Sequence, residues 1–358
     1  MTFNSQVLLP NQIMNELKTT IESLATAGKG LLAADESSAT IEKRFAALNI
    51  PCTEESRRTY RELLLSSPGI EQYISGVILF EETLGQKTSQ GISFPEFLNR
   101  QGIIPGIKVD KGLIRLAGTV DENTTQGLDG LAERLIGYKQ QGARFAKWRV
   151  VYSISNNTPS LLAIKTNAES LARYASICQE AGIVPIVEPE VLIDGEHDLK
   201  TCFEISEQVL QAVFNALHFH QVFLEYLILK PSMVIPGKNS RETVKPEAVA
   251  EATIKVLSRT VPAAVPSINF LSGGQSPSQA TENLNAMHKL KNSLPWNVSF
   301  SYSRALQEPC LKLWAGKAEN FARAQQIFVL RAKLNSLAAQ GKYGSDHEAD
   351  YQAEYEIH

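Results

Sequence analysis

The sequence contains few of the residues that build metal centres or disulfide frameworks. Its 358 residues include four cysteines and six histidines. The cysteines are widely spaced and form no Cys-x-x-Cys motif, which is typical of reduced thiols in a cytoplasmic protein. His218 and His220 lie close together, but they follow a helical pattern and have no third ligand nearby. We therefore expect neither a metal site nor a bound cofactor.

Long apolar runs and a strong charge imbalance are also missing. No segment approaches the ~18 uninterrupted apolar residues of a membrane span. The first ten residues carry no basic residue and no apolar stretch typical of a signal peptide. The net charge is −3 and both signs are spread along the chain, which argues against binding to nucleic acid or to an anionic membrane. We expect a cytoplasmic protein with neither of these partners.

What the sequence does contain is a repeated pattern of short apolar, β-branched runs separated by helical periodicity. Eight runs are expected to be strands, at 30–36, 76–82, 105–110, 145–152, 183–190, 224–231, 267–274 and 297–304. Apolar residues at i, i+3 and i+4 predict helices over 128–141, 167–181, 201–217, 246–260, 277–290 and 320–340. Eight strands alternating with helices favour a closed (β/α)8 barrel, or TIM barrel, over an open sheet.

The domain organisation follows from the same pattern. No linker rich in proline, glycine or serine separates the units, so residues 1–340 are predicted to form a single α/β barrel domain. Residues 341–358 are polar and lack apolar periodicity, which predicts a flexible C-terminal tail.

Charged residues stand at the ends of most of the predicted strands. They are Asp35 and Glu36, Lys108 and Asp110, Lys147 and Arg149, Glu188 and Glu190, Lys230, and Arg304. Residues two apart on a strand face the same way, so three of these pairs can point inward together. A single pair at a strand end often only meets solvent. The recurrence of such charges favours a central cluster of lysines and carboxylates at the C-terminal ends of the strands, where barrel active sites lie.

Lys230 is the most informative member of this set. It ends the apolar run at 224–229 and precedes Pro231, which stops the strand. Burial of an unpaired ammonium is costly, and enzymes use that cost to keep an amine neutral and nucleophilic. A nearby Lys147 would depress the pKa of one of the two amines, and Glu188 could act as general acid and base.

With these residues in view, the chain closely resembles class I fructose-bisphosphate aldolase, the Schiff-base type. The resemblance extends from residue 28 to about 343 and rests on long, ordered motifs. They include GKGLLAADES (28–37), GVILFEETL (76–84), GIKVDKG (106–112), FAKWR (145–149), IVPIVEPE (183–190), LKPSM (229–233), FLSGGQS (270–276) and FSYSRAL (300–306). The resemblance implies reversible cleavage of fructose 1,6-bisphosphate into dihydroxyacetone phosphate and glyceraldehyde 3-phosphate, and commonly a homotetramer.

The resemblance also implies roles for individual residues. Lys230 would form the Schiff base, Glu188 would be the acid/base glutamate with Glu190 as its partner, Lys147 would assist imine formation, and Asp35 would take the proton of the C4 hydroxyl. The residues that correspond to substrate-binding positions are Lys108, Arg149, Ser272, Gly273, Ser303 and Arg304, together with Ser37, Lys43, Arg44 and Arg57.

Two features depart from the family pattern. The family usually has Ser-Tyr-Gly-Arg where this chain has Ser303 before Arg304, and this reduces backbone freedom beside the expected phosphate pocket. Many members also end in a tyrosine that helps proton transfer, whereas this chain ends in His358. Tyr351, Tyr355 and His358 receive no assigned role.

Two other functions compete with this interpretation. Another Schiff-base barrel enzyme, such as a transaldolase or deoxyribose-phosphate aldolase, would handle one phosphate, whereas the basic pair Lys43 and Arg44 indicates a second phosphate site. A non-catalytic barrel that serves as a scaffold would be expected to lose Lys230, Glu188 or Lys147, and all three are present.

Overall fold

The computed structural model describes residues 9–290 and 293–356 and contains a closed barrel of parallel strands. The barrel strands are β1 (Gly30–Ala34), β2 (Ile74–Leu79), β3 (Ile104–Lys108), β6 (Phe145–Tyr152), β7 (Val184–Val191), β8 (Ile228–Leu229), β9 (Ser267–Phe270) and β10 (Asn297–Tyr302). Their order around the barrel is β1-β10-β9-β8-β7-β6-β3-β2. The predicted (β/α)8 fold is confirmed, and every predicted strand overlaps a barrel strand.

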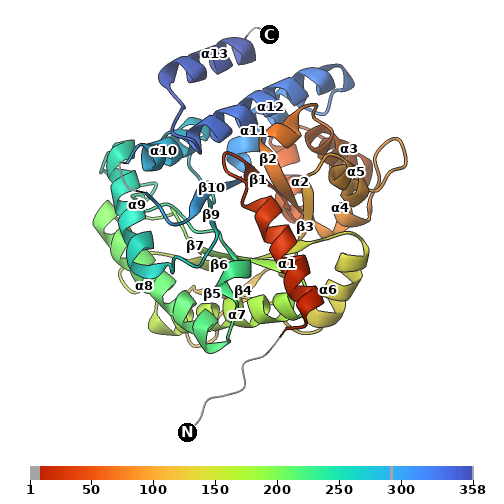
Figure 1. Ribbon diagram of the computed structural model, residues 1–358. Helices are drawn as coiled ribbons and strands as arrows, with labels where there is room; N and C mark the ends of the chain where they lie inside the picture. Colours follow the sequence, from red (N-terminus) through yellow and green to blue (C-terminus); the bar gives the residue numbers. More distant parts are fainter. Residues whose placement is uncertain (1–8, 291–292, 357–358) are drawn as a thin grey trace.

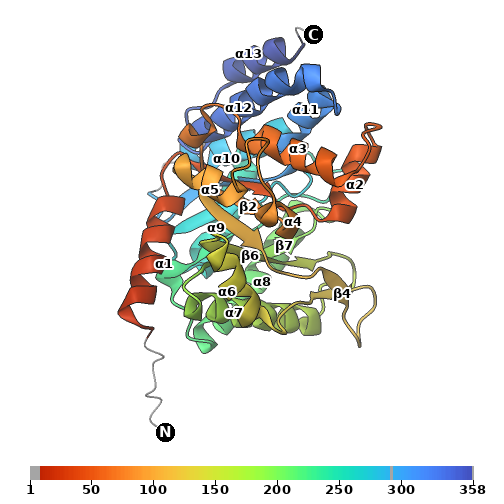
Figure 2. The same cartoon turned by 90° about the vertical axis from the view of Figure 1, so that its right-hand side faces the viewer.

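Helices surround the barrel, as the views in Figures 1 and 2 show. The α-helices are α1 (Asn11–Leu24), α2 (Ser38–Ala46), α3 (Glu54–Leu65), α4 (Glu81–Gly85), α5 (Phe94–Arg100), α6 (Leu131–Gln140), α7 (Leu161–Glu180), α8 (Leu199–Phe219), α9 (Pro246–Thr260), α10 (Pro277–Lys289), α11 (Arg304–Trp314), α12 (Phe321–Ala338) and α13 (Ser345–Glu356). The described part of the chain also contains the short 3-10 helices η1 (Ile70–Gln72), η2 (Leu224–Tyr226) and η3 (Ala318–Asn320). None of the described helices is long and apolar enough to cross a membrane.

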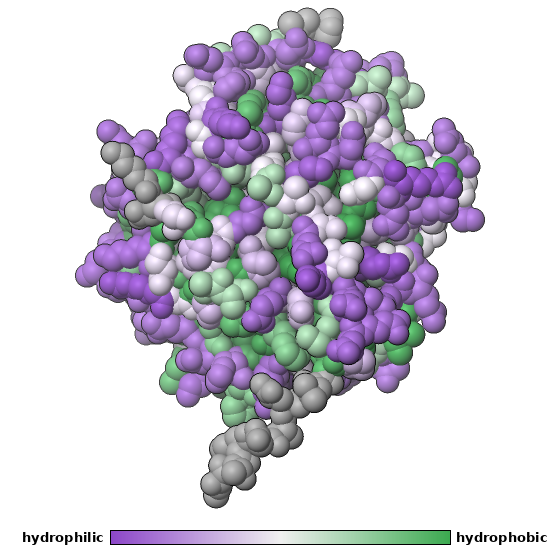
Figure 3. Space-filling model, in the orientation of Figure 1, coloured by the Kyte–Doolittle hydropathy of each residue, from purple (hydrophilic) through white to green (hydrophobic). Residues whose placement is uncertain are grey.

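The N-terminal end of the barrel is closed by α1, which lies across the opening in Figure 1. Leu17, Ile21 and Leu24 of α1 are buried against apolar residues that point into the barrel, among them Phe145. Space there is tight, because a Cβ added at Gly106 would lie 2.3 Å from the Phe145 ring. Figure 3 shows this face with hydrophobic and hydrophilic residues intermixed. Apolar packing at this end leaves the opposite end of the barrel for polar residues.

Residues 224–226 do not belong to a strand, although the apolar run predicted one. They form η2, and β8 is reduced to Ile228–Leu229. The side chain of Gln179 explains the difference, because its amide donates to the carbonyls of Phe223 (2.8 Å) and Tyr226 (3.2 Å) and accepts from the Phe223 N–H (2.9 Å). These bonds replace the ladder partners that a longer strand would need.

A small antiparallel hairpin was not predicted. It consists of β4 (Leu113–Arg115) and β5 (Asn123–Thr125) and follows β3. Its strands are three residues long, too short to give a measurable alternation of apolar and polar residues.

The segment after residue 341, expected to be a flexible tail, contains helix α13. Glu348 of α13 pairs with Arg331 of α12 at 2.8 Å and accepts a hydrogen bond from the Tyr343 hydroxyl at 2.7 Å. Tyr351 is buried, and the Arg331 guanidinium lies 5.2 Å from its ring centroid. His358 lies outside the described residues. The flexibility of the segment stays a prediction.

Candidate active site

Six charged side chains meet at the C-terminal ends of the barrel strands. Asp35 follows β1, Lys108 ends β3 and Asp110 follows it, Lys147 lies on β6, Glu188 on β7, and Lys230 follows β8. We call this set the central cluster. Five of its members are buried, and Lys108 is half-buried. Parallel register brings their strands to the same height, since Lys108 pairs with Lys147 across β3 and β6.

Lys230 is held at the end of the shortest strand. Its backbone N–H donates to the Val187 carbonyl at 2.8 Å, so the chain still follows β7 at this point. The Lys230 side chain is only 4% exposed, and its Nζ lies 3.0 Å from Glu188 Oε1. Glu188 is therefore within reach to accept a proton from the amine.

Lys147 contacts three carboxylates. Its Nζ lies 2.7 Å from Asp35 Oδ2, 3.2 Å from Glu188 Oε2 and 4.0 Å from Asp110 Oδ2. Burial alone would lower the pKa of this ammonium, but the three carboxylates outweigh it and raise the pKa of Lys147 above its ordinary value. Lys147 is therefore not an amine with a lowered pKa, and the expectation that one of the two neighbouring amines has a lowered pKa stays a prediction.

Asp35 reaches the cluster from β1, which is not a neighbour of β6 in the barrel. Burial opposes ionisation of its carboxyl group, but Lys147, Lys230 and Lys108 lower the pKa of Asp35 to about 2. Asp35 is therefore a carboxylate at neutral pH.

Asp110 belongs to the cluster although it received no role beyond its strand-end position. Its Oδ1 lies 2.7 Å from Lys108 Nζ and accepts from the Gly112 N–H at 3.2 Å. Its Oδ2 is buried and accepts no hydrogen bond from the described residues. The spacing of two residues from Lys108 is the sequence signal that identifies it.

Arg149 and Glu190 form a pair beside the central cluster. Arg149 Nε donates to Glu190 Oε2 at 2.5 Å, and a third of the arginine side chain is exposed. Burial works against the charge of Arg149, but Glu190, Glu188 and Asp110 raise the pKa of its guanidinium. Arg149 stands opposite Glu188 in the register of β6 and β7. The Arg149 guanidinium therefore lies close enough to interact electrostatically with the Glu188 carboxylate.

Two loops at the same end of the barrel form a candidate anion site. Ser272, Gly273 and Gly274 follow β9, and both glycines have positive φ, at +53° and +83°. Side chains rarely adopt this conformation, so the glycines allow a turn that a substituted residue would strain. A Cβ added at Gly274 would lie 3.6 Å from Arg304 Nη2, which places the loop next to the exposed Arg304 at the start of α11.

Helix α2 supplies a second basic group. Ser37 caps this helix by accepting from the Thr40 N–H at 3.4 Å, and Lys43 is exposed. Arg44 is paired with Glu36 and also donates to the Ser303 hydroxyl at 3.1 Å. Arg44 of α2 thus contacts Ser303, the residue just before α11.

Arg57 is held by a different partner. Its Nε and Nη2 donate to the two carboxylate oxygens of Glu82, at 2.8 and 2.5 Å. Its described contacts do not join it to the central cluster.

Glu36 and Arg61 form a buried ion pair that sequence reasoning did not identify. Arg61 Nη1 lies 2.7 Å from Glu36 Oε2, and each side chain is 4% exposed. Arg61 comes from the middle of α3, so no strand-end position points to it.

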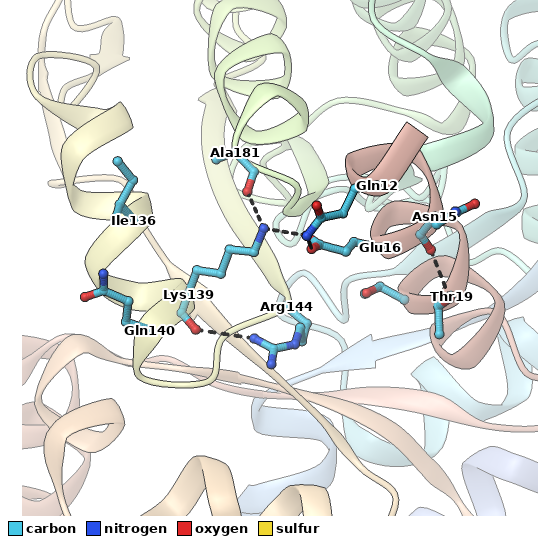
Figure 4. A pocket seen from close by; sticks show the side chains of 10 residues that line it. Gln12, Asn15, Glu16, Thr19, Ile136, Lys139, Gln140, Arg144 and Ala181 are labelled. Carbon is cyan, nitrogen blue, oxygen red and sulfur yellow. Dashed lines mark hydrogen bonds and ion pairs between the residues drawn. The ribbon is translucent and has the colours of Figure 1, made fainter. Parts of the chain in front are cut away.

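A groove of about 1070 Å³ lies at the opposite end of the barrel, between α1 and α6. Figure 4 shows Lys139 of α6 extended toward Glu16 of α1 and the Ala181 carbonyl, with Arg144 turned back to the Lys139 carbonyl. None of the central cluster residues lines this groove. The reactive groups therefore belong to the C-terminal end, despite the size of this cavity.

Comparisons with known proteins agree with this geometry. Residues 16–358 match the family model described as fructose-bisphosphate aldolase class-I. The chain is 54% identical to fructose-bisphosphate aldolase 4, cytosolic, of Arabidopsis thaliana, over 96% of this chain and 87% of the relative. It is 56% identical to the cytoplasmic isozyme of Spinacia oleracea, over 92% of each.

A solved structure is also closely similar. The aldolase of Plasmodium falciparum, in complex with TRAP and a small-molecule inhibitor, superposes with a TM-score of 0.94 at 48% identity, covering 96% of this chain and 100% of that one.

Proposed function

The chain belongs to the class-I fructose-bisphosphate aldolase family, and on that premise we propose that its central cluster cleaves fructose 1,6-bisphosphate through an imine at Lys230. The observation that carries the proposal is the position of Glu188 between two lysines, with one carboxylate oxygen toward Lys230 and the other toward Lys147. Such an arrangement can move protons to and from the amine during imine formation and hydrolysis.

Imine formation begins when Lys230 loses a proton to Glu188. The free amine attacks the C2 carbonyl of the ketose, and the carbonyl oxygen becomes the hydroxyl of a carbinolamine. That hydroxyl then takes a proton and leaves as water, which produces the protonated imine. Lys147, kept as an ammonium by its three carboxylates, is a donor that can stabilise the oxygen as it leaves.

Carbon–carbon cleavage uses the protonated imine as an electron sink. Asp35 takes the proton of the C4 hydroxyl, the C3–C4 bond breaks, and its electron pair moves into the imine to form an enamine. The aldehyde product leaves first. Protonation of the enamine carbon and hydrolysis of the imine then release dihydroxyacetone phosphate and restore Lys230.

Two basic regions can hold the two phosphates. Ser272, Gly273 and Arg304, with the backbone of Ser303, would bind one phosphate at the start of α11, where backbone N–H groups favour an anion. The second phosphate would lie at α2, near Ser37, Lys43 and Arg44. Lys108 and Arg149 would contact the sugar between these regions. Arg57 would contact the substrate only after its ion pair with Glu82 breaks.

We also propose that the protein is a homo-oligomer, a tetramer by family resemblance. Exposed apolar side chains support an interface at the β4–β5 hairpin and the start of α7. They are Leu113, Ile114, Val120, Leu161 and Leu162. The Ser160 N–H donates to Glu122 at 2.7 Å, which joins these two segments into one surface. Light scattering of the wild type and of V120K should show whether this surface is an interface.

Two smaller proposals concern location and the end of the chain. Relatives named as cytosolic or cytoplasmic support a cytoplasmic location. Residues 1–340 are proposed as the catalytic barrel and 341–358 as a flexible tail that assists proton transfer. Truncation after residue 341 should then slow a proton-transfer step without removing imine formation.

The experiment that tests the proposed reaction is a cleavage assay with purified protein and fructose 1,6-bisphosphate. Both triose phosphates should appear in equal amounts, and a chelator should leave the rate unchanged. Activity that a chelator abolishes and zinc restores would contradict the imine mechanism.

A further inference from the structure

Ser303 lies between β10 and α11, where the family pattern has glycine. Its backbone dihedrals are φ −105° and ψ −86°. The negative φ means that glycine is not required here, so a side chain causes no left-handed strain. The group that serine adds to this position and that makes new contacts is its hydroxyl.

The Ser303 hydroxyl uses its full hydrogen-bonding capacity. It donates to Glu36 Oε1 at 2.8 Å and accepts from Arg44 Nη2 at 3.1 Å and from Gln307 Nε2 at 3.3 Å. A hydroxyl offers one donor and two acceptor positions. In this arrangement the hydroxyl serves protein partners and is not available to a phosphate.

Glu36 ties the Ser303 hydroxyl to three further elements. Its Oε1 also pairs with Arg44 of α2, and its Oε2 faces Arg61 of α3. Burial opposes the charge of Glu36, but Arg61 and Arg44 lower its pKa below the ordinary value. The carboxylate is therefore a charged anchor that joins the end of β1, α2, α3 and the start of α11.

Arg44 stands at the exposed edge of this network. Its side chain is 19% exposed, whereas that of Glu36 is 4% exposed. Two of its N–H groups bind Glu36 and Ser303, and no other described residue accepts a hydrogen bond from it. Three of the five N–H donors of the guanidinium therefore remain for a ligand. An arginine that is already fixed in place loses less rotamer freedom when it binds an anion.

We propose that the Ser303 hydroxyl is a positioning group that fixes Arg44 for the second phosphate and so favours ketose bisphosphates over monophosphates. The proposal rests on the proposed function, because it assumes that Arg44 meets the second phosphate. Ser303 acts through Arg44 and needs no contact with substrate through its side chain.

The test compares three variants with fructose 1,6-bisphosphate and fructose 1-phosphate. S303A removes the hydroxyl and keeps the Cβ, S303G also restores the glycine, and S303T keeps a hydroxyl. S303A and S303G should raise KM for the bisphosphate by about threefold to tenfold, as expected for loss of one side-chain restraint. Cleavage of the monophosphate should be affected less than cleavage of the bisphosphate, so the ratio of kcat/KM between the two substrates should fall. S303T should keep the wild-type preference.

Three outcomes would overturn the assignment. An unchanged ratio of kcat/KM between the two substrates in S303A removes the role of the hydroxyl. A change in S303G without one in S303A assigns the effect to the backbone instead. Wild-type protein that fails to cleave the bisphosphate overturns the proposed function as well, whereas wild-type cleavage with an unchanged ratio overturns only the role of Ser303.

Discussion

Both ends of the barrel carry a close lysine–carboxylate pair, and the two pairs differ in burial. At the C-terminal end, Lys147 lies 2.7 Å from Asp35, with side chains 4% and 10% exposed. At the N-terminal end, Lys139 lies 2.5 Å from Glu16, with side chains 31% and 36% exposed. The distances are alike, but exposed pairs contribute little and buried pairs shift proton affinities strongly. Burial, rather than the presence of the pair, separates a reactive centre from a surface contact.

The fold produces this difference. At the N-terminal end, α1 covers the barrel and packs apolar side chains into it. At the C-terminal end, neighbouring strands in parallel register present lysines and carboxylates to the same enclosed space. Each charge there keeps a partner, so the cluster is buried without leaving an isolated ion.

The largest predicted effect is loss of the nucleophile. K230M should lower kcat/KM for fructose 1,6-bisphosphate by more than about 10³-fold, because no imine can form. K139M, the matched lysine variant at the other end of the barrel, should stay within about twofold, as expected for a surface pair. Steady-state kinetics of both variants would measure these losses. Equal losses of kcat/KM in K230M and K139M would contradict the prediction.

Removal of the acid/base group should rank second. E188Q keeps the size of the side chain but can no longer exchange protons, so kcat should fall by about 10²–10⁴-fold. E16Q serves as the control, and we expect its kcat to match that of the wild type. If E188Q kept the kcat of the wild type, another group would have to move the protons.

A third prediction concerns stability. E36Q leaves the buried Arg61 without a charged partner and should lower the free energy of unfolding by about 3–5 kcal/mol. E16Q breaks an exposed pair and should cost no more than about 1 kcal/mol. Urea unfolding would measure both changes. If both variants lost a similar free energy of unfolding, burial would not determine how much an ion pair stabilises the protein.

The smallest predicted effect is a loss of stability at low pH. The pKa of Asp35 is lowered from 3.8 to about 2 in the folded protein, so its stabilising contribution is complete above pH 3.8 and is lost as the pH falls toward 2. This contribution is on the order of 2 kcal/mol. D35N should therefore lose less stability than wild type across this range, which unfolding curves at several pH values can measure. Parallel pH profiles for the two proteins would argue against it.

Much of the fold could be predicted from periodicity. Strand positions and the helix at 246–260 follow from patterns that burial imposes directly on the sequence. The contacts that shortened β8 could not be predicted, because Gln179 is more than forty residues away along the chain. Helix α1 was missed, although Leu17, Ile21 and Leu24 carry helical spacing.

The residues of the candidate site could also be predicted only in part. Charges at strand ends pointed to the residues that the barrel brings together, because topology alone places such positions at one end. The partners supplied by helices gave no such signal, and Arg61 is the example. Nor could spacing reveal that Arg57 is held by Glu82. The direction of the Lys147 pKa depended on how many carboxylates lie within reach, and only the structure supplies that number.

The central claim is that the buried cluster makes Lys230 the amine that forms the imine. The most direct measurement is reduction with borohydride in the presence of dihydroxyacetone phosphate, followed by peptide mass mapping. The account predicts one adduct per chain, located at Lys230, in the wild type and in K139M, and none in K230M. An adduct at Lys147 or Lys108, or trapping that persists in K230M, would contradict it.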